Sequence, residues 1–104
     1  MILAGDIGGT KCNLALYELH STGYRKIVQQ RYQSREFSAF DQIIEKFLLD
    51  TRKETKDAGA GAIEAAGFGV AGPVIDHRVK ATNLPWAVDG PVLAQQLATE
   101  HIVL

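Results

Sequence analysis

Cysteine, methionine and tryptophan each occur once in the 104 residues, and proline occurs three times. The single cysteine, Cys12, excludes an intrachain disulfide and is typical of proteins from a reducing compartment. An excess of one charge is also lacking, since the chain has 11 Lys and Arg and 12 Asp and Glu, which gives a formal net charge of -1. Because no positive surplus is available to bind a phosphate backbone, we expect no nucleic-acid partner.

Long hydrophobic runs are missing as well. The longest nearly uncharged apolar stretch, residues 65–75, is rich in glycine and far too short to cross a bilayer. The N-terminus has no basic segment and carries Asp6 early, which argues against a secretory signal. We therefore expect a cytoplasmic protein without a membrane partner. Hydrophobic residues at 46% and charged residues at 22% are ordinary for one folded globular domain.

The first third of the chain predicts three antiparallel strands. An apolar run at residues 2–4 stops at a glycine-rich segment, and apolar residues then alternate with others over 11–19, which is the period of a strand. Residues 20–23 have the composition of a turn, and residues 24–33 predict a third strand. The glycine-rich segment would then form the first turn of an antiparallel meander.

A stripe of apolar residues at helical spacing follows. Its members recur at i, i+3, i+4, i+7 and i+8: Phe40, Ile43, Ile44, Phe47 and Leu48. Ser38 carries the hydroxyl of a helix N-cap, and Asp41 comes three residues later, as in a shorter version of the capping box. We expect a charged, solvated tail at residues 52–57 and a flexible link at 58–61.

The last third predicts two strands and a second helix. The apolar run at 65–70 is bounded by glycines and predicts a buried strand, and 78–82 predicts a short strand after a turn at 76–77. Asp89 as N-cap and Pro91 in the first turn begin a helix. Its apolar face would consist of Val92, Leu93, Gln96 and Leu97.

The most informative segment is the run GDIGGTK at residues 5–11, which lies between two predicted strands. Adjacent glycines permit a tight turn with positive φ, and amides without side chains in the way can approach an anion closely. Thr10 adds a hydroxyl, Lys11 a positive charge, and Asp6 a carboxylate for hydrated Mg²⁺, which keeps several waters when few carboxylates bind it. These groups suit a nucleoside triphosphate with its metal. A plain hairpin turn remains the alternative.

Two other glycine motifs that bind nucleotides are excluded by the residues around them. The phosphate-binding pattern GxxxxGK[ST] needs a glycine before the lysine and a hydroxyl after it, whereas Thr10 precedes Lys11 and Cys12 follows. Residues 67–72 match GxGxxG, but no helical pattern follows, as a dinucleotide-binding turn requires. We interpret these glycines as allowing a buried strand to pack closely and to leave through a turn.

The segment ILAGDIGGT at residues 2–10 closely resembles the first phosphate motif of bacterial glucokinases, in the actin–hexokinase–Hsp70 superfamily of ATPase folds. FGVAGP at 68–73 and ATNLPW at 81–86 resemble the sugar-side segment of the same family. Order and spacing match over nearly the whole chain. The resemblance implies an α/β, RNase-H-like small domain (βββαβα, mixed sheet) and ATP-dependent phosphorylation of the glucose 6-hydroxyl in glycolysis.

The resemblance also implies roles for individual residues. The ATP phosphates would lie against the loop formed by Gly5, Asp6, Ile7, Gly8, Gly9, Thr10 and Lys11, with Asp6 orienting Mg²⁺ through water. Glucose would lie near the segments that carry Gly72, Pro73, Thr82, Asn83, Pro85 and Trp86. From residue types alone, Asn83 is equally a turn cap and Trp86 equally a core residue.

The catalytic residue that the resemblance implies is not in this chain. The family carries its catalytic base in an Asn-Asp pair just after the strand that begins near His101, and the sequence ends at Leu104. Residues 1–104 are therefore expected to be an incomplete N-terminal small domain, without the large C-terminal domain and inactive alone. A homodimer is compatible with the resemblance for the full-length protein.

Other functions stay open at this point. A related kinase would phosphorylate another sugar, such as fructose or N-acetylmannosamine, and this part of the chain does not discriminate between them. A sugar-responsive repressor of the related ROK type is disfavoured, because it would carry a helix-turn-helix before the glycine loop, which begins four residues from Met1. A non-enzymatic ATP-binding module of the actin or Hsp70 kind would lack the segment at 81–86.

Overall fold

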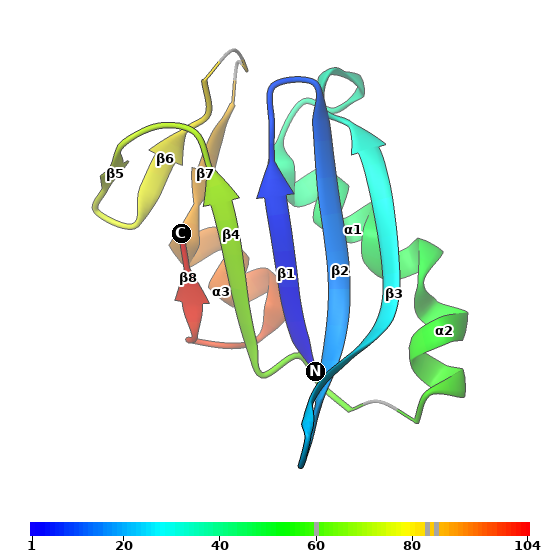
Figure 1. Cartoon of the computed structure of the whole chain (residues 1–104). Helices are drawn as coiled ribbons and strands as arrows, with labels where there is room; N and C mark the ends of the chain where they lie inside the picture. The colour runs from blue at the N-terminus through cyan, green and yellow to red at the C-terminus, as the bar shows by residue number, and fades with distance from the viewer. Residues whose placement is uncertain (60, 83, 85) are drawn as a thin grey trace.

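The central feature of the computed structural model, which describes residues 1–59, 61–82, 84 and 86–104, is a mixed sheet of five strands. The strands are β1 (Ile2–Ile7), β2 (Lys11–His20), β3 (Gly23–Gln33), β4 (Ala65–Val70) and β8 (Ile102–Val103). Their order across the sheet is β3-β2-β1-β4-β8 (Figure 1). The first three form an antiparallel meander, and β4 and β8 run parallel to β1. The expected mixed α/β fold is confirmed.

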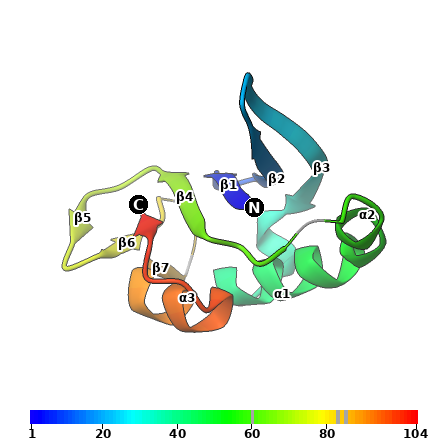
Figure 2. The ribbon, with the colours of Figure 1, turned by 90° about the horizontal axis from the view of Figure 1, so that it is seen from below.

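All of the helices lie on one face of this sheet (Figure 2). They are the short 3-10 helix η1 (Ser34–Glu36) and the α-helices α1 (Phe40–Asp50), α2 (Arg52–Asp57) and α3 (Gly90–Leu97). Alternate strand residues and the helical stripes bury one another in the layer between them. This core includes Leu3, Leu14, Leu16, Phe40, Ile43, Ile44, Phe47, Phe68, Leu93 and Leu97. In the described part of the chain, no helix is both long and apolar enough to span a bilayer.

A second sheet of three short strands stands beside β4. Its strands are β5 (Val74–Ile75), β6 (Arg78–Lys80) and β7 (Ala87–Asp89), all antiparallel. The sequence predicted one strand here, at 78–82; the structure ends that strand at Lys80 and adds β5 and β7. Asp76 and His77, with φ of 52° and 61°, form the two-residue turn between β5 and β6, as the primed hairpin turns require. Strands of two or three residues are too short to show a period of two.

Two details of the helices differ from the sequence prediction. The N-cap of α1 is Ala39 rather than Ser38, and no side chain caps it. Instead the Gln42 side chain, in the first turn, accepts a hydrogen bond at 3.0 Å from the Ser38 main-chain N–H. In α3, Val92 is 47% exposed rather than part of the buried face. It lies in the first turn of a short helix, where only Leu93 and Leu97 reach the core.

Among the glycines of residues 67–72, Gly72 is required by the backbone, whereas Gly67 is not. Gly72 leaves β4 with φ of 139°, and a Cβ there would lie 2.7 Å from the Lys80 carbonyl oxygen, so the turn requires glycine. The expected close packing is wrong for Gly67, because a Cβ there would meet no atom within 4 Å. Gly67 alternates with the buried Ala66 and Phe68 and therefore lies on the sheet face that the helices leave uncovered.

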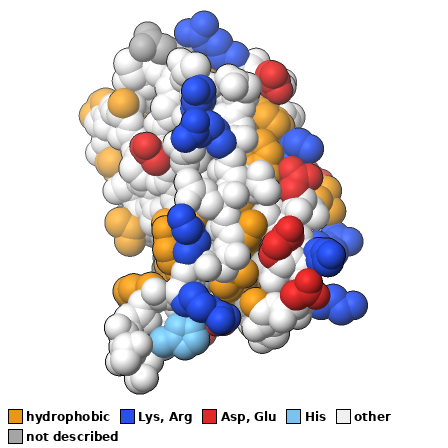
Figure 3. All heavy atoms as spheres, turned by 45° about the vertical axis from the view of Figure 1, so that its right-hand side comes forward, with side chains coloured by type: hydrophobic (Ala, Val, Ile, Leu, Met, Phe, Trp, Pro, Cys, Tyr) orange, Lys and Arg blue, Asp and Glu red, His pale blue; other side chains and the backbone are white. Residues whose placement is uncertain are grey.

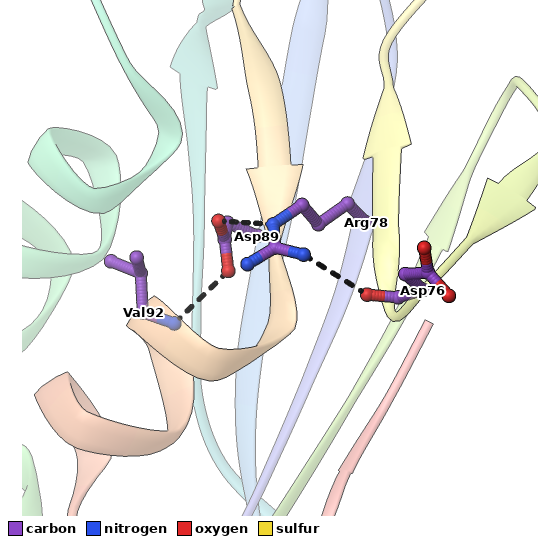
Figure 4. A network of polar contacts seen from close by, with 4 residues as sticks. All are labelled: Asp76, Arg78, Asp89 and Val92. Atoms are coloured by element: carbon purple, nitrogen blue, oxygen red, sulfur yellow. Dashed lines mark hydrogen bonds and ion pairs between the residues drawn. The ribbon is translucent and has the colours of Figure 1, made fainter.

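Asp89 is the N-cap of α3, as predicted (Figure 4). One carboxylate oxygen accepts the Val92 main-chain N–H at 3.2 Å, and the other accepts Nε of Arg78 at 2.8 Å. Arg78 also donates to the Asp76 carbonyl oxygen at 3.4 Å. The hydrogen bond from Arg78, supported by the one from Val92, lowers the pKa of Asp89 against the opposing effect of burial. The carboxylate thus joins α3 to the small sheet.

Replacing Asp89 by alanine is expected to lower the free energy of unfolding by about 1 kcal/mol at neutral pH, because the cap is lost. Asn retains the cap without the charge and should cost less. Because folding lowers the Asp89 pKa, the stabilisation due to the charge is complete above the unfolded pKa and lost as pH falls through the folded pKa. Urea denaturation should therefore show the difference between wild type and Asp89→Asn shrinking from pH 7 to about pH 3. A constant difference would contradict the assignment.

Candidate functional site

The two segments singled out in the sequence meet at one edge of the central sheet. β1 and β4 are parallel neighbours, with Asp6 opposite Gly69 and Ile7 opposite Val70, so their carboxyl ends lie side by side. The glycine hairpin (residues 8–10) leaves β1 there, at the top of Figure 1. Residues 71–73 leave β4 at the same edge, and both the N–H and the hydroxyl of Thr82 donate to the Ala71 carbonyl oxygen, at 3.1 and 3.0 Å.

The glycine hairpin is fixed by hydrogen bonds to its main chain. Gly8 donates its N–H to the Lys11 carbonyl oxygen at 3.0 Å, which closes the turn. Ser34, fully buried at the start of η1, donates its hydroxyl to the Gly8 carbonyl oxygen at 2.6 Å and its N–H to the Thr10 carbonyl oxygen at 2.9 Å. Ser34 could not be recognised from the sequence, because no local pattern marks it and its position follows from the pairing of β2 with β3.

Gly5 and Gly8 leave space for neighbouring atoms and do not adopt positive φ. Positive φ among the glycines occurs at Gly23, Gly59 and Gly72, and not at Gly8 or Gly9, which corrects the expectation from sequence. A Cβ at Gly8 would lie 3.0 Å from the Lys11 carbonyl oxygen. A Cβ at Gly5 would lie only 2.6 Å from Cδ1 of Phe68, so Gly5 lets the core pack against β1 directly below the hairpin.

Three polar side chains lie on the hairpin or on the strands directly beside it. Asp6, Thr10 and Lys11 are exposed, whereas the side chain of Ile7 is buried in the core. Gly69 leaves room beside Asp6, since a Cβ there would lie 3.9 Å from Oδ1 of the carboxylate. The site can therefore offer a carboxylate, a hydroxyl, an ammonium group and main-chain amides within one short turn.

Asp6 also begins a polar row across the uncovered face of the sheet. It pairs with Asn13 on β2, which pairs with Arg31 on β3, and Nε of Arg31 donates to Oδ1 of Asn13 at 2.9 Å. A shallow hollow of about 260 Å³ lies on this face next to Asp6 and Asn13. Over the side of the molecule in Figure 3, Lys and Arg side chains are interspersed with Asp and Glu, so binding of an anion would depend on local groups.

The residues assigned to the sugar side are only partly on the surface. Gly72, Pro73 and Thr82 are exposed, and Asn83 and Pro85 lie outside the described residues. Trp86 is 6% exposed, stacks on Phe40 with ring centroids 6.0 Å apart, and donates Nε1–H to the Phe37 carbonyl oxygen at 3.2 Å. Trp86 therefore occupies the position of a core residue, which is one of the two interpretations left open by the sequence.

Cys12 is a buried thiol on the strand that follows the hairpin. The thiol of Cys12 is buried, and burial raises its pKa, so it stays protonated and is no nucleophile. Among the residues that the structure describes, no group of three or more His, Cys, Asp or Glu side chains could hold a metal ion. A cation at Asp6 would therefore be held by one carboxylate and water, which is the manner in which Mg²⁺ accompanies phosphates.

Comparison with known proteins gives one consistent family. The family model described as Glucokinase matches residues 3–104. The chain is 39% identical to the glucokinase of Nostoc punctiforme over 105 aligned residues, and 38% identical to that of Synechocystis over 109. These alignments cover 100% and 98% of this chain but only 29% and 30% of the relatives. The chain thus spans less than a third of the length of these curated relatives.

Solved structures agree on the fold. A glucokinase from an Antarctic psychrotroph matches with a TM-score of 0.70 at 23% identity, over 98% of this chain and 30% of that protein. A putative sugar kinase from Cytophaga hutchinsonii matches with a TM-score of 0.63 at 20% identity, over 99% of this chain and 35% of that protein. At these sequence identities, the likeness shows that the strands and helices are arranged as in those two structures, in agreement with the topology described above.

Proposed function

Because the chain belongs to the glucokinase family, we propose that it is the N-terminal small domain of a cytoplasmic sugar kinase that transfers the γ-phosphate of ATP to the 6-hydroxyl of glucose. The observation that supports this most strongly is the hairpin at residues 8–10. It lies at the sheet edge with the carboxylate of Asp6, the hydroxyl of Thr10 and the ammonium group of Lys11 exposed around it. We name glucose as the acceptor, in place of other hexoses, because the relatives from Nostoc punctiforme and Nostoc sp. are named glucokinases.

In this proposal the hairpin binds the phosphates of ATP. Main-chain amides that no side chain shields stabilise phosphate oxygens, and Thr10 and Lys11 add a donor and a positive charge. Asp6, an exposed carboxylate, fits a hydrated Mg²⁺, which when bound would neutralise charge on the β- and γ-phosphates. The protein groups thereby hold the terminal phosphate in one position at the edge where the sugar-side segment also lies.

The second half of the site would come from the remainder of such an enzyme. Phosphoryl transfer depends on positioning and charge stabilisation, together with a base that accepts the proton of the sugar hydroxyl. β8 runs parallel to β4 and β1, so chain that continues beyond it would emerge at the hairpin edge. A base supplied there would face the phosphate loop, and closure of two lobes would exclude water as a competing acceptor.

A fused enzyme tests the proposal. This chain would be joined at Leu104 to the part of Nostoc punctiforme glucokinase that follows the matched segment. We expect ATP-dependent phosphorylation of glucose in a coupled assay, and weaker phosphorylation of fructose and N-acetylmannosamine. A folded fused enzyme that binds ATP without transferring phosphate to any hexose would favour the non-enzymatic module instead.

The 104-residue chain alone is expected to show no measurable phosphorylation of glucose. General-base catalysis contributes about 10²–10⁴-fold in typical enzymes, and no residue of this chain is assigned to that role. The assay is the same as for the fused enzyme, at matched concentration. Turnover that depends on both ATP and glucose in the purified chain would show that the base lies within residues 1–104.

A further inference from the structure

We propose that Ser34 is a positioning residue, which aims the Gly9 amide of the hairpin at the phosphates of the nucleotide. This inference rests on the proposed function, and it concerns a residue outside the segments that resemble the family motifs. Ser34 follows β3 directly and is fully buried. Its effect would be exerted entirely through the main chain of residues 8–10.

Ser34 holds both arms of the hairpin. Its hydroxyl donates to the Gly8 carbonyl oxygen at 2.6 Å, and its N–H donates to the Thr10 carbonyl oxygen at 2.9 Å. The two bonds straddle Gly9. A turn tied at the residues before and after its tip keeps one conformation, whereas a glycine pair left free would sample many.

The geometry of the peptide bond means that this restraint also fixes the direction of the Gly9 N–H. In a trans peptide the carbonyl of one residue and the N–H of the next point to opposite sides, and the described chain contains no cis peptide. Because the Gly8 carbonyl points to Ser34, the N–H of Gly9 points away from Ser34 and from the buried layer. A ligand at the tip of the hairpin, where Gly9 is half-buried and Thr10 is exposed, could accept this N–H.

Cys12 completes a directed chain of hydrogen bonds. The Ser34 hydroxyl has one proton, which it gives to the Gly8 carbonyl, so Cys12 is the donor in its 3.2 Å contact with Oγ of Ser34. Burial raises the pKa of the Cys12 thiol and keeps that proton in place. With the thiol protonated, the hydroxyl can accept from Cys12 while it donates to Gly8.

The test compares two fully buried hydroxyl groups in the fused enzyme. Ser34→Ala removes the bond to Gly8 and is expected to raise KM for ATP about tenfold, while KM for glucose stays within about twofold. Thr51→Val is the matched control, since it removes another fully buried hydroxyl, which donates to the Phe47 carbonyl oxygen at 2.7 Å, but leaves both bonds from Ser34 to the hairpin. Equal increases in the two KM values, or the same increase in KM for ATP with Thr51→Val, would overturn the proposal.

Two further measurements keep the outcome decisive. If Ser34→Ala does not fold, Ser34→Cys retains a weak donor and should raise KM for ATP by a smaller factor; no rise would refute the role. Independently of turnover, addition of MgATP to the ¹⁵N-labelled 104-residue chain should shift the Gly9 amide resonance in wild type and less in Ser34→Cys. An inert wild-type fused enzyme would refute the proposed function, whereas an unshifted Gly9 resonance would refute the role of Ser34.

Discussion

Phe40→Ala is expected to lower the free energy of unfolding by about 3–5 kcal/mol, the usual cost of removing a buried phenyl ring. Phe40 is 2% exposed and lies between two other aromatic rings. Phe68 on β4 meets it edge-on with centroids 5.2 Å apart, and Trp86 stacks on it at 6.0 Å. Truncation would leave a cavity between the rings of Phe68 and Trp86.

Urea denaturation followed by far-UV circular dichroism measures this effect. Trp86 fluorescence is unsuitable as the only probe, because the substitution changes the environment of the indole directly. Leu49→Ala serves as the control on the same helix, since Leu49 is 55% exposed and should change stability by less than about 0.5 kcal/mol. A loss below about 1 kcal/mol for Phe40→Ala would mean that this core is loosely packed.

Asp6→Asn is expected to reduce kcat/KM of the fused enzyme by about 10²–10³-fold, as loss of one group that stabilises charge in the transition state typically does. Asn has the same shape, and Asp6 is exposed, so the fold should be unaffected. The negative charge at the end of β1 would be lost, and with it the attraction for a hydrated cation beside the phosphates.

Kinetics at increasing Mg²⁺ concentration would show whether the loss of activity in Asp6→Asn comes from a lost cation contact. A lost cation contact should raise the Mg²⁺ concentration needed for half-maximal rate. Asp76→Asn is the control, because Asp76 is an exposed carboxylate on the turn between β5 and β6, and asparagine tolerates its φ of 52°. If Asp6→Asn keeps more than about a third of the wild-type rate, Asp6 is not part of the phosphate site.

The regular part of the fold could be predicted from the sequence because its periodicities are long and unbroken. Alternation over residues 11–19 gave β2, and the apolar stripe from Phe40 gave α1. Asp89 is predictable as an N-cap because its carboxylate acts within three residues along the chain. The glycine hairpin was likewise evident, since it interrupts two strands that pair locally.

Features that depend on distant contacts could not be predicted in this way. β5 and β7 are too short to show a pattern, and β7 exists only because β6 lies beside it. The interpretation of Gly5 as part of the loop missed its contact with Phe68, which is 63 positions later in the sequence (68 minus 5). Ser34 has no local signature, because its hydrogen bonds are to Gly8 and Thr10, which lie more than 20 positions earlier in the sequence.

The position of β1 in the middle of the sheet has a consequence for how the domain folds. Its pairing with β2 closes only the hairpin at residues 8–10, whereas its pairing with β4 must bring together segments separated by residues 8–64. Loop-closure entropy makes the second event slower, and parallel pairing of distant segments is the slow step in many small domains. The glycine hairpin at residues 8–10 therefore belongs to the part of the chain that can form early, and the neighbouring segment at residues 71–73 is added later, when β4 docks.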